Sequence, residues 1–295
     1  MNTYLDCIPC FLKQALFAAR AATNDDKRIK EVLDRVARLT PSIPLGNPPP
    51  ETARLVYGVV REVTGVEDPF KAHKEKSIQK ALSLYDELKS LVKNSKDPLH
   101  TAVRVAIAGN VIDLGVNQAF DLEAEMKDLL QRRLSARHYR CFTQNLEKAR
   151  TVLYLGDNAG ETVFDRILIE ALGRDTVYAV REVPIINDAT FEDAEKSGIS
   201  EVARIVSSGC DAPGTILKRC SPEFLEIYNN SDLIISKGQG NFESLSEEKG
   251  PVFFLFKVKC PVIAGHIGVD IGEMILKDAR LPGYRSFDDR GDDVS

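Results

Sequence analysis

Five short runs of β-forming residues alternate with helical segments in the second half of this 295-residue chain. Strand, helix and strand in succession form the unit of a mostly parallel sheet that helices cover on both faces. We therefore predict a three-layer α/β/α sandwich with a mostly parallel sheet over 149–295. The predicted strands are 151–155, 176–180, 203–206, 233–236 and 252–257, and the helical segments between them begin near Gly160, Thr190, Ser221 and Asn241.

The first 148 residues carry a helical pattern instead. Apolar residues recur at three- and four-residue spacing, and the proline-rich connector 41–50 interrupts the pattern. We predict an all-helical subdomain over 1–148 and an α/β metal- and phosphate-binding domain over 149–295. The alternative is that both regions form one continuous structural unit. The charged run 71–80 is predicted to face solvent, and 265–295 to end in a frayed tail. The predicted helices cover 11–22, 25–39, 52–64, 69–93 and 98–114.

Composition and charge exclude several classes of protein. The net charge of −5 argues against a general nucleic-acid binder, and no apolar run is long enough to cross a bilayer. The six cysteines lack the spacing of a secreted disulfide scaffold, and the amino terminus lacks a secretory signal pattern. We therefore expect a soluble cytoplasmic protein that binds neither nucleic acid nor membranes. The sequence does not predict an oligomeric state.

Two polar residues follow the first predicted strand. Gly156 ends the strand, and Asp157 and Asn158 lie where the chain turns into the next helix. Ligands of open α/β sheets bind at the carboxyl ends of the strands, where these side chains are placed. A carboxylate beside a carboxamide offers hard oxygen ligands to a divalent cation. The alternative is structural, with Asp157 as a helix cap and Asn158 as a turn residue.

A second Asn-Asp pair follows the second predicted strand. Asn187 and Asp188 come after an apolar lead-in, and parallel strands would bring them to the same edge of the sheet as Asp157. Asp188 would then supply the second carboxylate of a metal site. Alternatively, Asp188 or Thr190 caps the helix that begins near Phe191. The sequence leaves both interpretations open.

The fourth predicted strand leads into Lys237-Gly-Gln-Gly-Asn241. Gly238 and Gly240 can expose backbone N–H groups, Lys237 adds a positive charge, and Asn241 begins a helix. The combination predicts an anion cradle. It is not a Walker loop, because no Gly-Lys-Ser/Thr follows at the required spacing.

Two further pairs of polar residues are candidates for the site. Lys257 and Lys259 end the fifth strand and add positive charge there, or they lie on the surface as most lysines do. Asn110 and Asp113 interrupt an otherwise apolar helix on one face. Polar groups in such a place need partners, either on a neighbouring helix or in a cleft between the two halves of the chain.

The motif Cys7-Ile-Pro-Cys10 could be redox active or half of a zinc site. A thioredoxin-like motif follows a strand, and no strand is predicted before Cys7. No second Cys-x-x-Cys supplies further zinc ligands. Each cysteine is therefore expected to pack as a buried apolar residue. The four histidines form no His-x-x-x-His pair, which argues against a classical zinc hydrolase.

Taken together, the motifs resemble those of the damage-control phosphatase family. This family was formerly a domain of unknown function and includes the acidic-residue-methyltransferase-like proteins. The resemblance covers essentially the whole chain and looks closest to the prokaryotic, largely archaeal branch with an N-terminal Cys-x-x-Cys. It implies an α/β/α sandwich with an added helical region. The motifs that carry it are Cys7-Ile-Pro-Cys10, Gly109-Asn-Val-Ile-Asp113, Gly156-Asp-Asn-Ala-Gly-Glu161, Asn187-Asp-Ala-Thr190 and Lys237-Gly-Gln-Gly-Asn-Phe-Glu243.

The resemblance also implies an activity and a site. The activity is metal-dependent removal of phosphate from small phosphorylated metabolites, often side products or damaged forms. Asp157, Asn158 and Asp188 match the family's ligands of one divalent ion, which would be Mn²⁺, Co²⁺, Ni²⁺ or Mg²⁺. The positions that match its substrate- and phosphate-contacting residues are Asn110, Asp113, Glu161, Lys237, Gly238, Gly240, Asn241 and Lys259.

We therefore predict a metal-dependent phosphatase acting on sugar phosphates or on nucleotide- or cofactor-related phosphates, with water or Asp157 as nucleophile. The second interpretation is an S-adenosylmethionine-dependent methyltransferase, because 152–160 loosely mimics its glycine-rich turn and Glu182 follows the second strand. Against it, Asn158 and Ala159 occupy places where close cofactor approach favours glycine. A redox or metal-carrier protein built on the cysteine motif is the third.

Overall fold

The computed structural model describes residues 1–109 and 134–284. Its six-stranded sheet has the strand order β3-β2-β1-β4-β5-β6, in which β1 to β5 are parallel and β6 is antiparallel. The chain order reverses between β1 and β4, which is the switch point where open α/β sheets bind ligands. The strands are β1 (Thr151–Leu155), β2 (Asp175–Val180), β3 (Arg204–Ser207), β4 (Leu233–Lys237), β5 (Val252–Lys257) and β6 (Met274–Asp278).

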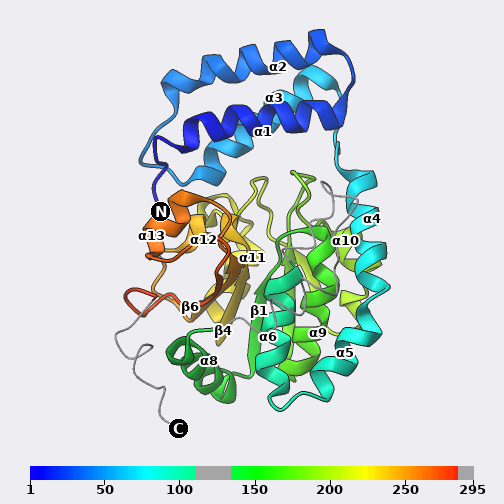
Figure 1. Ribbon diagram of the computed structural model, residues 1–295, viewed down its shortest axis with the longest axis vertical. Coiled ribbons are helices and arrows are strands. Elements are labelled where there is room, and N and C mark those ends of the chain that lie inside the picture. Colours follow the sequence, from blue (N-terminus) through cyan, green and yellow to red (C-terminus); the bar gives the residue numbers. More distant parts are fainter. Residues whose placement is uncertain (110–133, 285–295) are drawn as a thin grey trace.

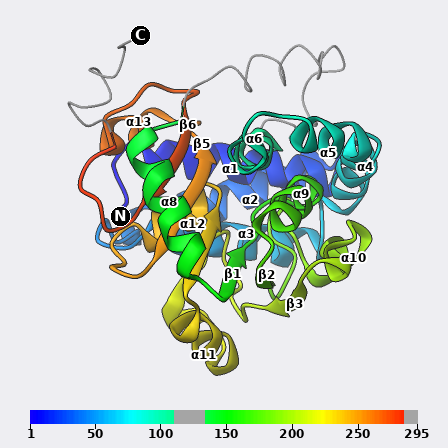
Figure 2. The ribbon, with the colours of Figure 1, turned by 90° about the horizontal axis from the view of Figure 1, so that it is seen from below.

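Helices cover both faces of the sheet, and the predicted three-layer α/β/α sandwich is confirmed (Figures 1 and 2). Side chains alternate along β1, so that Tyr154 joins the core on one face while Leu153 and Leu155 join the core on the other. One face packs against α4 (Lys71–Leu82), α5 (Tyr85–Lys93), α6 (Pro98–Ala108), α8 (Ala136–Lys148), α9 (Thr162–Leu172) and α10 (Phe191–Lys196). The other packs against α11 (Pro222–Asn230), α12 (Gln239–Leu245) and α13 (Pro261–Ile267).

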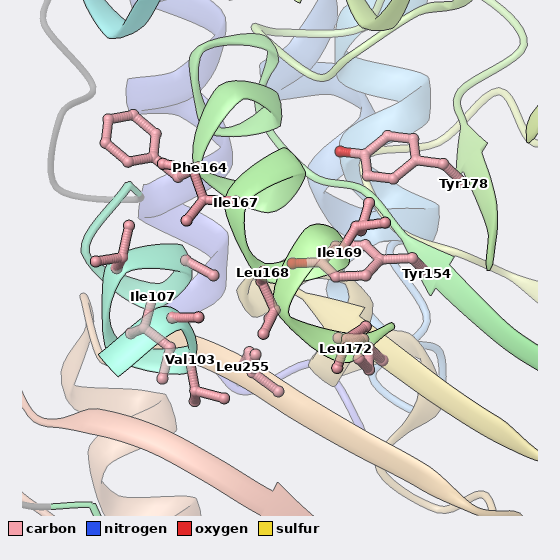
Figure 3. Close-up of a cluster of buried hydrophobic side chains, with 14 of the residues drawn as sticks. Val103, Ile107, Tyr154, Phe164, Ile167, Leu168, Ile169, Leu172, Tyr178 and Leu255 are labelled. Carbon is pink, nitrogen blue, oxygen red and sulfur yellow. The ribbon is translucent and has the colours of Figure 1, made fainter. Parts of the chain in front are cut away.

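Helix α9 shows how the sequence determines this packing. Phe164, Ile167 and Leu168 follow helical spacing, and Gly173 ends the helix at a φ of 58°. Nearly the whole helix is buried, because it lies between the sheet and α6 (Figure 3). Burying each large apolar side chain stabilises the fold by roughly 1.5–3 kcal/mol.

Helices α1 (Cys7–Ala22), α2 (Asp26–Leu39) and α3 (Pro49–Thr64) form a separate layer above the strands in Figure 1. They share a third apolar core, which Ile185 joins from the loop after β2. The described helices up to residue 148 are thus divided between two cores, because α4, α5, α6 and α8 pack on the sheet. The domain boundary at residue 148 stays a prediction. No helix in the described ranges is long and apolar enough to span a membrane.

Several predicted elements need correction. The frayed tail predicted at the end of 265–295 lies outside the described residues, whereas α13 and β6, for which no element was predicted, lie before it. The apolar run of β6 is short, and its pairing with β5 identifies it as a strand. The helix predicted from residue 52 begins at Pro49, since proline fits a first turn where N–H groups lack helical partners. The helix predicted over 69–93 breaks before Tyr85, whose hydroxyl bonds to Glu170 on α9.

Lys74 corrects the prediction that 71–80 faces solvent throughout. Its side chain is 3% exposed, and its ammonium lies 2.8 Å from carboxylate oxygens of Asp68 and Asp193. The second of these carboxylates belongs to α10, so the ion pair joins α4 to α10. A partner 119 residues away in the sequence leaves no local signal.

Candidate active site

Backbone hydrogen bonds join the loops after β1 and β2. The Ala159 N–H donates to the Asn187 carbonyl at 2.8 Å, and the Ala189 N–H donates to the Asp157 carbonyl at 2.7 Å. Asn158 and Asp188 therefore face each other in an isolated antiparallel bridge. The two loops are held in register, and the side chains predicted as metal ligands come together at the carboxyl edge of the sheet.

These three side chains line a pocket of about 380 Å³ between the strand ends and the α1–α3 layer. The floor is polar, and Lys259 is the one cationic side chain that the described residues contribute to the lining. The α1–α3 layer supplies a mostly apolar wall, which would separate a bound ligand from water. Its lining residues are Cys7, Cys10, Phe11, Gln14, Pro49, Pro50 and Ala53.

Asp157 and Asp188 are buried carboxylates with perturbed pKa values. Burial raises the pKa of Asp157, and repulsion from Asp188 and Glu161 raises it further. Burial also raises the pKa of Asp188, although the Arg181 guanidinium opposes that shift. Buried carboxylates that repel one another are stabilised by a cation between them.

The donor set fits a hard divalent cation. Within the described residues, no group of three or more His, Cys, Asp or Glu side chains is arranged to hold a metal. A cation at this place would therefore take two carboxylates and the Asn158 amide oxygen, and it would complete its shell with water or substrate oxygens. Mg²⁺ and similar ions bind in this manner, whereas structural zinc requires four protein ligands.

Arg181 is a site residue that the sequence analysis missed. Its guanidinium is buried and donates from Nε to Asp188 at 2.8 Å, while a terminal nitrogen lies 4.0 Å from Asp157. Its other nitrogens donate to Thr215 and Asn241. Its position directly after β2 was the available signal, because that position points to the carboxyl edge of the sheet.

Lys237 and Glu161 do not line this pocket. The Lys237 side chain is fully buried, with its ammonium 2.9 Å from Glu161 and 2.5 Å from Asp165. Burial opposes its charge, yet the two carboxylates raise the pKa of Lys237 overall. The geometry therefore does not support direct phosphate contact by Lys237, whereas Lys259 lines the pocket.

The glycine segment after β4 also differs from the predicted anion cradle. The Gly238 N–H donates to the Leu255 carbonyl, so it continues the sheet ladder. Asn241 is fully buried, and its amide NH₂ donates to the carbonyls of Gly156 and Lys237. Among the predicted cradle residues, Gly240 lines the pocket. The segment thus acts mainly by holding neighbouring loops in place.

Two other predictions have different outcomes. Asn110 and Asp113 lie outside the described residues. Cys7 is half-buried and Cys10 exposed in the first turn of α1. Since Cys141, Cys220 and Cys260 are also half-buried, the prediction that each cysteine is buried is confirmed for Cys210 alone. Cys7 and Cys10 both line the pocket together with Cys260.

The methyltransferase interpretation lacks support at the turn that suggested it. A Cβ added to Gly156 would lie 2.6 Å from the Tyr178 hydroxyl, so the protein's own core occupies the space beside this glycine. A pocket at the switch point that brings Asp157, Asn158 and Asp188 together with Lys259 is instead typical of a phosphate-processing α/β enzyme.

Comparison with known proteins identifies the family. The chain belongs to the damage-control phosphatase ARMT1-like family, whose model matches residues 3–275. It is 35% identical over 282 residues to damage-control phosphatase PH1575 of Pyrococcus horikoshii, covering 93% of this chain and 97% of that protein. It is 32% identical over 279 residues to a damage-control phosphatase of Archaeoglobus fulgidus, covering 92% and 97%.

A solved structure agrees with this assignment. The crystal structure of the DUF89 family protein PH1575 matches with a TM-score of 0.85 at 32% sequence identity, over 95% of this chain and 99% of that chain. A third relative, the uncharacterised protein MJ0202 of Methanocaldococcus jannaschii, is 34% identical over 288 residues, covering 92% and 93%. The chain is thus a phosphatase of the damage-control family.

Proposed function

We propose that this phosphatase depends on a divalent cation held by Asp157, Asn158 and Asp188. The observation that carries the proposal is the bridge between the two loops, beside which the oxygen-bearing side chains of Asp157, Asn158 and Asp188 line the same pocket. The cations that fit such ligands are Mn²⁺, Co²⁺, Ni²⁺ and Mg²⁺. Sugar phosphates and nucleotide- or cofactor-related phosphates are the proposed substrates.

Different side chains have different proposed roles around the phosphoryl group of the substrate. A bound cation would polarise the phosphoryl oxygens and offset the charge that develops on them. Lys259 is placed to bind a further phosphoryl oxygen, since it lines the same pocket as Asp157. Arg181 orients Asp188 through its 2.8 Å hydrogen bond. The apolar wall from α1 and α3 excludes water from the leaving group.

Removal of divalent ions tests the proposal directly. Protein treated with a chelator and freed of it is expected to lose hydrolysis of p-nitrophenyl phosphate, because two buried carboxylates would then repel the phosphate. Adding Mn²⁺, Co²⁺, Ni²⁺ or Mg²⁺ should restore phosphate release. Full activity in protein shown by elemental analysis to be metal-free would overturn the proposal.

Lys259 gives a second prediction. Replacing Lys259 with alanine is expected to raise KM for a phosphomonoester about 10-fold or more, because a charge-assisted hydrogen bond contributes roughly 1.5–3 kcal/mol. The side chain is exposed, so the thermal midpoint should hardly change. Lys257→Ala is the matched control, because Lys257 lies two residues away and outside the pocket lining. Equal KM values for the two variants would contradict the role of Lys259.

The remaining expectations concern the setting of the enzyme. A cytoplasmic location without nucleic-acid or membrane partners is proposed from composition and charge. An archaeal origin is proposed from the relatives named above.

A further inference from the structure

We propose that Glu161 is a positioning residue that fixes the Asn158 amide with its oxygen toward the pocket, and that the buried Lys237 holds Glu161 in place for this purpose. The inference rests on the proposed function, because the amide oxygen matters only if a cation binds there. It gives Glu161 and Lys237 a role that does not require contact with substrate.

Two carboxylates hold the nitrogen of the Asn158 amide. Its Nδ2 donates to Glu161 Oε1 at 2.6 Å and to Asp157 Oδ2 at 3.1 Å. Rotating the amide by 180° would set its carbonyl oxygen against two acceptor-only groups, so this orientation is the one that the surroundings allow. In the described part of the chain no hydrogen bond engages the amide oxygen, although the residue lines the pocket. The oxygen is thus presented for binding.

Glu161 is itself fixed from the core. The residue is 1% exposed, and its second oxygen accepts a hydrogen bond from Lys237 Nζ at 2.9 Å. The same ammonium donates to Asp165 at 2.5 Å. Asp165 accepts from the hydroxyls of Tyr154 and Tyr178 at 2.7 and 2.8 Å, and these stacked rings lie between the sheet and α9 (Figure 3). A continuous set of hydrogen bonds therefore connects the rigid core to the Asn158 amide.

Charge balance explains why Lys237 is buried beneath the pocket. Its single positive charge faces the carboxylates of Glu161 and Asp165 and attracts both. Buried ion pairs contribute little net stability relative to apolar side chains, so stability alone does not account for this cluster. Lys237 thus offsets the charge of Glu161 in the core, while Asp157 and Asp188 line the pocket. Residues behind metal ligands commonly set ligand orientation in this way.

The test exchanges the carboxylate and the amide between the two positions. In Glu161→Gln, the new side chain cannot accept from both Lys237 and Asn158 with the same strength, because one of its two acceptors has become a donor. In Asn158→Asp, two carboxylates face each other at the former 2.6 Å contact. The double variant restores the donor–acceptor pair between positions 158 and 161 with the roles reversed, and it still offers an oxygen to the pocket. It lacks only the donor that Asn158 gives to Asp157 at 3.1 Å.

The readout is the dissociation constant for Mn²⁺ in the absence of substrate, measured by calorimetry, with the thermal midpoint of each metal-free protein alongside. We expect Glu161→Gln to weaken Mn²⁺ binding about 10- to 100-fold. The double variant should bind Mn²⁺ clearly more tightly than either single variant. Glu170→Gln is the matched control, because Glu170 lies on α9, the helix that Glu161 precedes, and pairs with Lys89 at 2.8 Å without contacting Asn158.

The outcomes separate the two proposals. If the wild-type protein binds none of the four cations, the proposed function fails. If the wild-type protein binds Mn²⁺ and Glu161→Gln binds it equally well, the positioning role is overturned while the metal site stands. A double variant as weak as the weaker single variant would show that packing, rather than the donor–acceptor pair, governs binding, and it would also overturn the positioning role.

Discussion

Replacing Asp157 with asparagine is expected to lower phosphate release by about 10² to 10³-fold, the usual effect of losing one preorganised electrostatic contact. Asparagine keeps the shape of the side chain and removes its negative charge. The metal-free variant should be at least as stable as the wild-type protein, because the carboxylate is buried and repelled by Asp188 and Glu161. Phosphate release at saturating Mn²⁺ and the thermal midpoint without metal check the two parts.

The dependence of stability on pH distinguishes this explanation from general damage to the fold. The pKa of Asp157 is raised in the folded protein, so the folded state holds this proton more tightly than the unfolded chain does. Stability from this group is therefore lost as pH rises from the unfolded pKa, about 3.9, through the higher folded pKa. As pH rises above the unfolded pKa, the thermal midpoint of metal-free wild-type protein should therefore fall more than that of Asp157→Asn.

Asp188→Asn provides the contrast. Its activity should fall as far as that of Asp157→Asn, but its metal-free form should also be less stable, because the Arg181 guanidinium loses its 2.8 Å partner inside the protein. Retention of wild-type activity by folded Asp157→Asn would contradict the assigned site. If metal-free Asp157→Asn is less stable than metal-free Asp188→Asn, the explanation that burial and repulsion destabilise the Asp157 carboxylate is contradicted.

The sequence predicts those parts of the fold that depend on neighbours along the chain. All five parallel strands were predicted to within one residue at either end, because β-rich runs between turns are a local signal. The rule that parallel strands end at a common edge places Asp157, Asn158 and Asp188 together, as the structure does. The antiparallel β6 was missed, since it is identified by its pairing with β5.

The parts that the sequence did not predict depend on contacts between distant residues. Lys237 directly follows the predicted strand 233–236 and so resembles an exposed phosphate ligand, but its partners Glu161 and Asp165 lie more than 70 residues earlier. No local pattern shows that they meet. In the same way, helical spacing predicts α1 and α3 without showing that they close the pocket over the strand ends. Burial of charge and placement of helices are decided by tertiary structure.

Gly238 is the backbone position with the largest expected effect. Its φ of 80° and ψ of 163° are disfavoured for any residue with a side chain, and an added Cβ would lie 2.0 Å from the Asp157 carboxylate. Gly238→Ala should therefore displace the carboxylate and lower phosphate release by about 10²-fold or more, as the loss of Asp157 itself would. The backbone strain should also destabilise the protein by roughly 1–3 kcal/mol.

Gly268→Ala separates strain from collision. Gly268 also has a φ of 80°, at the end of α13, but an added Cβ there would meet nothing within 4 Å. This variant should lose roughly 1–2 kcal/mol of stability from the left-handed backbone and keep wild-type phosphate release and Mn²⁺ affinity. Full phosphate release by a destabilised Gly238→Ala variant would show that activity does not depend on the position of the Asp157 carboxylate beside Gly238. If both variants lose activity equally, general destabilisation rather than displacement of Asp157 is the cause.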